Sequence, residues 1–268
     1  MIEIFQHSFF INAFIVGVLL GFSMSYFSVF VVQRRISFIG SGLAHSAFGG
    51  VALGLLLNIE PLFIAIPFTV IVSILIFHLQ NRTNISSDAL IGVLFSFAVA
   101  LGIIFIAIKQ TYSQDAYAYL FGSILTVNEL DIILSIIIFL ITLISFKIYW
   151  ERWAYATFDY ELALVDKIPV TKDNYIFSIF LGITIALSIK IIGIILISAF
   201  IVIPGATAKL YSTTFFKLTL NSIVLGILSI VFGLVISFLL DLPSGAVIIL
   251  LQSIIFLSIT ALKQLLKF

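Results

Sequence analysis

The chain has 268 residues, of which 62% are hydrophobic and only 9% are charged, and its formal net charge is +1. Soluble domains carry about 25% charged residues, so this chain lacks the polar surface that a soluble protein of its length needs. The small net charge argues against a nucleic-acid binder, and the absence of cysteine excludes a disulfide framework, a thiolate metal site and a cysteine nucleophile. We therefore expect an all-α polytopic membrane protein in the lipid bilayer, with residues 1–268 forming a single transmembrane domain.

Apolar runs of roughly 17–25 residues are long enough to cross a bilayer. In chain order, we expect spans at residues 9–32, 42–57, 62–80, 89–109, 130–149, 175–189, 191–204, 217–239 and 245–262. The stretch 175–204 has two interpretations, because it fits either one long kinked helix or a tight hairpin that turns near Lys190 and Gly193.

The positions of the basic residues favour the hairpin. Lys and Arg collect on the cytoplasmic side of membrane proteins. With the N-terminus outside and nine spans, only Lys109 and Lys190 of the 13 basic residues fall outside. The others, all on the cytoplasmic side, are Arg34, Arg35, Arg82, Lys147, Arg152, Lys167, Lys172, Lys209, Lys217, Lys263 and Lys267. We predict nine spans with the C-terminus inside, and eight spans as the alternative.

Two connecting segments contain apolar residues that an ordinary loop would lack. Residues 150–174 form the longest polar stretch, in which apolar residues alternate with carboxylates, a pattern that suits a short helix lying in the membrane interface. Residues 115–131 are too few to cross and too apolar for a plain loop, so we expect them to fold back against other helices.

His45 lies well inside the second predicted span. Ionisable groups within a membrane usually face a cavity and mark a transport pathway, although a lone histidine can also be hydrogen-bonded to a neighbour on its own helix. No Asp or Glu lies in the middle of any predicted span. A proton- or sodium-coupled carrier typically needs such a carboxylate, so its absence favours an energy source outside the membrane.

The seventh run ends at Pro204 and Gly205, and a small-residue turn then leads to Lys209. A small, exposed cytoplasmic helix of this kind would suit the docking of a soluble partner. An ordinary helix–loop–helix turn would have the same pattern.

Five ordered blocks, at residues 34–57, 118–127, 158–170, 191–210 and 241–250, together resemble the permease subunits of bacterial zinc and manganese ABC importers, the ABC-3 family and its ZnuB-like branch. The resemblance implies a homodimeric permease in the cytoplasmic (inner) membrane. It also implies two cytoplasmic ATP-binding subunits and an extracytoplasmic metal-binding protein. The chain itself would be a transport subunit without enzymatic activity or a permanently bound cofactor. The family's ATPase-contacting region matches Pro204, Gly205, Ala206, Thr207, Ala208 and Lys209.

The resemblance also implies a metal pathway, and here the chain departs from the family. His45 matches the His of a G-D-x-L-x-H motif, but Ser41 stands at the Asp position, and Ser123 replaces the Asp usual after LFG. Residues 41 and 45 share one helix face, so we expect His45 and Ser41 to line the pathway. Neutral imidazole suits zinc, whereas manganese prefers oxygen-rich sites. Zinc is therefore the favoured cargo, a manganese or ferrous-iron importer of the same build is the alternative, and a stand-alone carrier or channel is the alternative of a different class.

Overall fold

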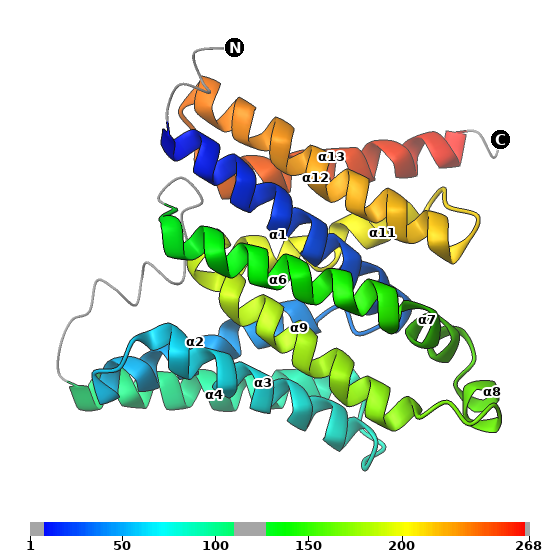
Figure 1. Cartoon of the computed structure of the whole chain (residues 1–268), viewed down its shortest axis with the longest axis horizontal. Coiled ribbons are helices and arrows are strands. Elements are labelled where there is room, and N and C mark those ends of the chain that lie inside the picture. The colour runs from blue at the N-terminus through cyan, green and yellow to red at the C-terminus, as the bar shows by residue number, and fades with distance from the viewer. Residues whose placement is uncertain (1–7, 110–126, 266–268) are drawn as a thin grey trace.

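The computed structural model describes residues 8–109 and 127–265, and this part of the chain is helical without strands (Figure 1). Its long helices are α1 (Ser8–Gln33), α2 (Ile39–Leu57), α3 (Pro61–Gln80), α4 (Ser87–Lys109), α6 (Glu129–Ile148), α9 (Val170–Ile192), α12 (Phe215–Leu240) and α13 (Ser244–Leu265). Its short helices are α7 (Trp150–Phe158), α8 (Tyr160–Val165), α10 (Ile194–Phe200) and α11 (Ile203–Lys209). The predicted all-α membrane fold is confirmed, since eight of these helices are long and apolar enough to cross a membrane.

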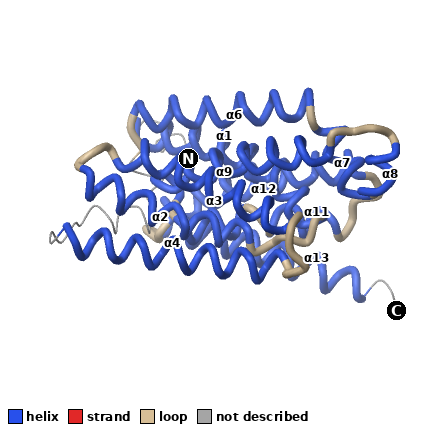
Figure 2. The backbone as a smooth tube through the Cα atoms, turned by 90° about the horizontal axis from the view of Figure 1, so that it is seen from below, coloured by secondary structure: helices blue, strands red, loops and turns tan. Residues whose placement is uncertain are grey.

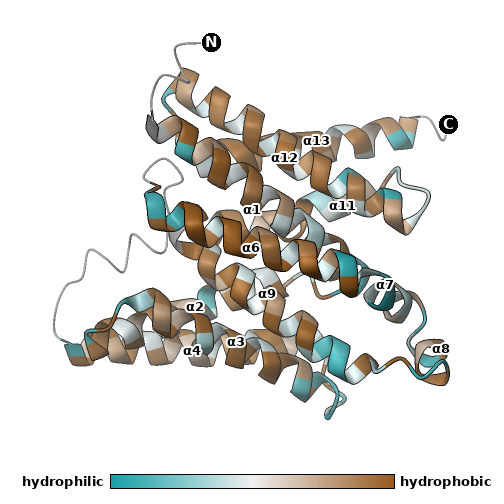
Figure 3. Ribbon diagram, in the orientation of Figure 1, coloured by the Kyte–Doolittle hydropathy of each residue, from teal (hydrophilic) through white to brown (hydrophobic). Residues whose placement is uncertain are grey.

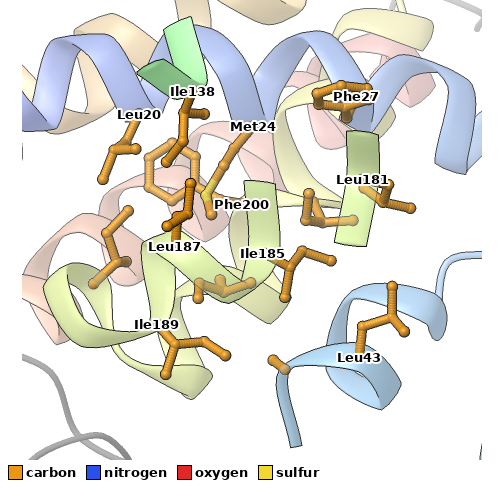
Figure 4. Close-up of a cluster of buried hydrophobic side chains, with 14 of the residues drawn as sticks. Leu20, Met24, Phe27, Leu43, Ile138, Leu181, Ile185, Leu187, Ile189 and Phe200 are labelled. Atoms are coloured by element: carbon orange, nitrogen blue, oxygen red, sulfur yellow. The ribbon is translucent and has the colours of Figure 1, made fainter. Parts of the chain in front are cut away.

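The apolar core lies where α1 crosses α9 (Figure 4). Its fully buried side chains include Leu20, Met24 and Phe27 of α1, Leu181 and Ile185 of α9, Ile138 of α6 and Phe200 of α10. Because lipid is as apolar as these side chains, close packing rather than the hydrophobic effect holds the helices together. Gly50 and Gly54 of α2 illustrate this, since they lie against Ala65 and Pro61 of α3 and so pack within the chain.

The outermost helices leave most of their surface uncovered. Only 17% of the most apolar stretch of α4 and of α13 is buried within the chain, compared with 72% for α1 and α2. Figure 2 shows α4 and α13 on the side of the bundle opposite α6. The hydrophobic residues run along the lengths of the helices, whereas hydrophilic residues gather at the ends of the bundle (Figure 3). This distribution fits a bundle whose sides face lipid or another copy.

The ends of α1, α3 and α13 and the starts of α9 and α12 lie at one end of the bundle, on the right of Figure 1, and most basic residues of the described chain belong to these helix ends or to the segments beside them. Arg34 follows α1 and donates hydrogen bonds to Thr157 of α7 and Asn174 of α9. Lys109, at the end of α4, instead donates to the carbonyl of Leu55 near the end of α2, at the opposite end. We infer from the positive-inside rule that the Arg34 end is cytoplasmic.

The stretch that follows α9 is a hairpin with a broken second arm. Gly193 separates α9 from α10 and has φ 83° and ψ 157°, a conformation essentially restricted to glycine. Leu196 of α10 lies near Gly245 at the start of α13, whereas Gly205 of α11 lies against Ser28 near the cytoplasmic end of α1. The α10–α11 pair therefore makes the return crossing, beside eight full-length helices. The span predicted at 191–204 is thus divided into two short helices, because the helix breaks between Phe200 and Ile203.

The polar segment at residues 150–174 is more ordered than its composition suggests. It contains α7, α8 and the first turn of α9, which begins at Val170 rather than at the predicted residue 175. Asp173 is buried in that first turn because Arg152 of α7 pairs with it at 2.6 Å. The predicted fold-back segment 115–131 lies mostly outside the described residues, and so does Ser123. Its last residues, Asn128 and Asp131, cap the start of α6.

Candidate functional site

His45 and Ser41 lie one turn apart on α2 and are both half-buried. His45 Nδ1 is 2.9 Å from the carbonyl oxygen of Ser41 and 3.4 Å from its Oγ. A carbonyl can only accept, so Nδ1 is the donor in this arrangement, and the tautomer with its proton on Nδ1 has a lone pair on Nε2. A hydrogen bond from one ring nitrogen to a carbonyl is the usual way in which proteins orient a metal-binding imidazole.

Small residues let α2 carry this histidine while packing tightly on its neighbours. Gly42 lies directly against Ile91 of α4, and a Cβ at Gly40 would lie 2.9 Å from the Cβ of Ile201. The ring of Phe95, also on α4, meets the imidazole edge to face at 5.1 Å between centroids. The imidazole is therefore oriented by the Ser41 carbonyl of its own helix and by the ring of Phe95 on α4.

One copy of the chain offers few ligands at this place. Across residues 8–109 and 127–265, no group of three or more His, Cys, Asp or Glu side chains could hold a metal ion. Zinc sites have about four ligands, of which catalytic sites supply three from protein. The described residues of a single copy thus provide one imidazole and the Ser41 oxygens, so a complete shell needs water or a second copy.

Of the two interpretations of the segment from Pro204 to Lys209, the structure does not fit a helix that is exposed along its whole length. Pro204, Gly205, Thr207 and Ala208 are buried within the chain, Ala206 is half-buried and Lys209 is exposed. The amide N–H of Gly205 donates to Ser28 Oγ at 2.9 Å, and a Cβ there would lie 2.8 Å from the Ser28 carbonyl oxygen. The small residues serve to pack α11 on α1 as the second half of a membrane crossing. ATPase contact at this segment stays a prediction, carried chiefly by Lys209.

Exposed apolar residues instead gather on α8 and at the last residue of α7. Phe158 is 64% exposed and Val165 is 74% exposed, and Leu162 and Leu164 are also exposed, at the cytoplasmic end of the bundle. Several exposed apolar side chains close together outside the spans are typical of an interaction surface. The sequence predicts that this helix lies in the membrane interface. The alternation of apolar and acidic residues that supports this prediction is equally compatible with a helix that binds a partner protein.

The α7–α8 joint is fixed by polar contacts. Asp159 Oδ1 accepts from the Leu162 amide at 2.9 Å and so caps the start of α8. Tyr155 of α7 donates its hydroxyl to Asp166 Oδ2 at 2.5 Å. This hydrogen bond, with a smaller contribution from burial, raises the pKa of Tyr155 to about 12. The patch is therefore presented on a defined helix rather than on a loose loop.

The eight apolar helices and the oriented intramembrane histidine define a multi-pass helical membrane protein with a polar position inside the bundle. The chain belongs to the ABC 3 transport family, whose model matches residues 6–263. The resemblance drawn from the sequence is thus confirmed, and the chain is a multi-pass protein of the cytoplasmic (inner) membrane.

Two relatives and one solved structure illustrate how similar the chain is to known proteins. The high-affinity zinc uptake system membrane protein ZnuB of Haemophilus influenzae is 33% identical over 247 residues, which cover 91% of this chain and 94% of ZnuB. The manganese import system permease protein ScaB of Streptococcus gordonii is 33% identical over 246 residues, covering 92% and 88%. The solved structure of PsaBC from Streptococcus pneumoniae in complex with Fab has a TM-score of 0.84 and 29% identity, covering 96% of this chain and 93% of that chain.

Proposed function

We propose that the chain is the permease subunit of an ATP-driven importer of a divalent metal, and that its cargo is zinc. The single observation that carries the choice of metal is the hydrogen bond between His45 Nδ1 and the Ser41 carbonyl, which leaves Nε2 free to bind. Neutral imidazole is a good zinc ligand, whereas manganese prefers carboxylate oxygens. The motif has Ser41 where a carboxylate would favour manganese.

A homodimer is the assembly that this pathway needs. Two copies would contribute two His45 imidazoles, and Ser41 hydroxyls or waters would bring the ligand number to about four. A shell without carboxylates binds a dication weakly, which suits a conduit that must release its ion. The metal is cargo in this scheme, delivered by an extracytoplasmic metal-binding protein, and no resident cofactor is required.

ATP hydrolysis would take place in two cytoplasmic subunits that dock on the basic end of the bundle. The exposed apolar patch formed by Phe158, Leu162, Leu164 and Val165 supports α8 as the main docking element. Exposed Lys209 at the end of α11 is a second candidate contact. Co-purification of the ATPase with Val165→Glu and with Lys209→Glu separates the two contacts. Loss in the first variant only assigns docking to α8, and loss in neither contradicts both assignments.

One observation supports the alternative of a manganese or ferrous-iron importer. ScaB, which is named for manganese import, has the same sequence identity to this chain as ZnuB does, 33%. Transport assays decide between the metals. In proteoliposomes that contain the permease and its ATPase, we expect ATP-dependent zinc uptake to exceed manganese uptake. Ser41→Asp should then raise manganese uptake relative to zinc. Uptake that proceeds without the ATPase would instead identify a stand-alone carrier or channel.

His45→Ala tests the pathway, with His78→Ala as the matched control. His78 is also a helical histidine, but it lies exposed at the cytoplasmic end of α3 and is 2.8 Å from the Tyr175 hydroxyl. We expect His45→Ala to reduce zinc uptake strongly while the dimer still assembles, and His78→Ala to leave uptake close to normal. Equal uptake by wild type and His45→Ala would show that His45 is a packing residue.

A further inference from the structure

A polar cavity of about 240 Å³ opens at the cytoplasmic end of the bundle, away from the His45 pathway. It lies between the end of α1, the end of α3, the α7–α8 joint and the first turn of α9. Its polar lining consists of Arg34, Gln80, Asn81, Thr157, Tyr160 and Asn174. The transport mechanism outlined above makes no use of this cavity.

Arg34 is the one charged side chain in the lining, and its guanidinium is held in place. Its Nε donates to Thr157 Oγ1 at 3.0 Å, and one terminal nitrogen, Nη1, donates to Asn174 Oδ1 at 3.1 Å. The ring of Phe177 lies beneath the guanidinium, 4.5 Å from its central carbon. The other terminal nitrogen, Nη2, has no hydrogen-bond partner among the described residues. The guanidinium is thus fixed beside the cavity, and its Nη2 can still donate hydrogen bonds.

The carboxylate whose charge acts on Arg34 is already paired. Asp173 offsets part of the positive charge of Arg34, but its Oδ1 lies 2.6 Å from Nη2 of Arg152 in an ion pair. Burial lowers the pKa of Arg34 to about 10, which expresses the cost of keeping this cation away from water. An anion in the cavity would offset that cost.

The other polar groups of the lining can donate hydrogen bonds. The Asn174 side-chain oxygen accepts from Arg34, which leaves its Nδ2 as a donor. Gln80, Asn81 and Tyr160 add two amides and a hydroxyl whose side chains have no partner in the described part of the chain. No Asp or Glu lines the cavity. A fixed cation among several donors is complementary to an anion with several acceptor oxygens, such as a phosphate group.

The depth of the cavity indicates the source of the phosphate. Arg34 directly follows α1, Asn81 directly follows α3, and Asn174 is the fifth residue of α9. All three residues are thus at the cytoplasmic boundary of the spans, the level at which lipid headgroups lie. Basic pockets between transmembrane helices on this side are suited to anionic headgroups. We propose that this cavity binds a phosphate group beside Arg34, supplied by the headgroup of an anionic phospholipid of the cytoplasmic leaflet.

The test is a ligand titration of the detergent-purified permease–ATPase complex, read as the midpoint of thermal unfolding. The probes are short-chain phosphatidylglycerol, short-chain phosphatidylcholine as the zwitterionic control, and inorganic phosphate. A ligand that binds only the folded state raises the unfolding midpoint in a saturable way. We expect phosphatidylglycerol to do so at lower concentration than the other two probes. Inorganic phosphate acting at the same concentration as phosphatidylglycerol would support the phosphate site while assigning it to a soluble source.

Arg34→Gln should weaken the apparent affinity for phosphatidylglycerol about tenfold or more, because it removes a charge-assisted hydrogen bond. Arg35→Gln is the matched control, since Arg35 is the exposed neighbour of Arg34 and its loss changes the net charge equally. Gln80→Glu places a carboxylate in the cavity and should abolish the response while the protein still folds. This second variant keeps the test decisive if Arg34→Gln fails to fold.

Either of two results would overturn the proposal. The first is a response to phosphatidylglycerol that is the same in wild type, Arg34→Gln and Gln80→Glu. The second is no response of wild type to any probe; if Arg34→Gln then also loses the ATPase, Arg34 would be assigned to a carboxylate of that partner. Neither result depends on which metal is transported, so failure here leaves the transport assignment untouched.

Discussion

Gly193 lies at the turn between the two arms of the α9–α10 hairpin, and Gly193→Ala should destabilise the protein. The residue has φ 83° and ψ 157°. Its amide N–H donates to the Ile189 carbonyl at 2.8 Å, and its own carbonyl accepts from the Ile197 amide at 3.2 Å. Any side chain at this position must either adopt a conformation essentially restricted to glycine or break these bonds.

The expected cost is that of the backbone strain. A residue held in such a region costs about 1–3 kcal/mol, which lowers the ratio of folded to unfolded protein by a factor of about 5–150 at 25 °C. Gly193→Asn should be no better than Gly193→Ala, because Asn tolerates the left-handed helical region but not a ψ near 157°. This distinguishes the observed turn from an ordinary helix C-cap.

Gly92→Ala in α4 is the matched control. No atom lies within 4 Å of a Cβ placed at Gly92, so alanine should be neutral there or stabilise the helix by up to about 1 kcal/mol. Unfolding by denaturing detergent, followed by circular dichroism, compares the three variants with wild type. Equal stability of Gly193→Ala and Gly92→Ala would refute the described hairpin geometry.

Three further predictions concern packing, pH and topology. Gly205→Trp should reduce the yield of folded protein and zinc uptake together, because the indole would displace Ser28 of α1. A normal yield with loss of only the coupling between ATP hydrolysis and uptake would instead support α11 as a docking element. The raised pKa of Tyr155 implies that the stability contributed by its bond to Asp166 is fully present below pH 10 and is lost as pH rises through about 12. An ultraviolet titration should therefore show a late-ionising tyrosine that Tyr155→Phe removes, and an unchanged titration would contradict the bond. A reporter fused after Asn58 should lie outside and one after Arg82 inside, and the reverse would invert the assigned orientation.

Hydropathy alone predicts the membrane class and most spans, because several apolar runs of bilayer length in one chain are typical of helical membrane proteins. The pairing of Ser41 with His45 also follows from sequence, since residues four apart share a helix face. The start of α9 does not follow, because Asp173 is buried only through Arg152, which lies 21 residues earlier in the chain. A polar segment that is neutralised by a distant partner has the same composition as a solvated loop.

The burial of α11 could not be predicted from the sequence for a related reason. Small residues such as Gly205 suit an exposed turn and also suit close helix packing, and only the position of Ser28 decides between them. The Arg34 cavity could not be predicted from the sequence either, because its lining residues come from segments that are far apart in the chain. Sequence pattern therefore locates single residues and helix faces, whereas contacts between distant helices require the structure.

The most direct test of a zinc pathway through His45 is zinc K-edge X-ray absorption on the purified permease dimer loaded with one zinc ion per two chains. If two His45 imidazoles and oxygen ligands bind the zinc, the first shell should contain nitrogen and oxygen, and the outer-shell scattering should be that of two imidazole rings. His45→Ala should remove the imidazole scattering. A spectrum without imidazole scattering, or one that His45→Ala leaves unchanged, would contradict this pathway.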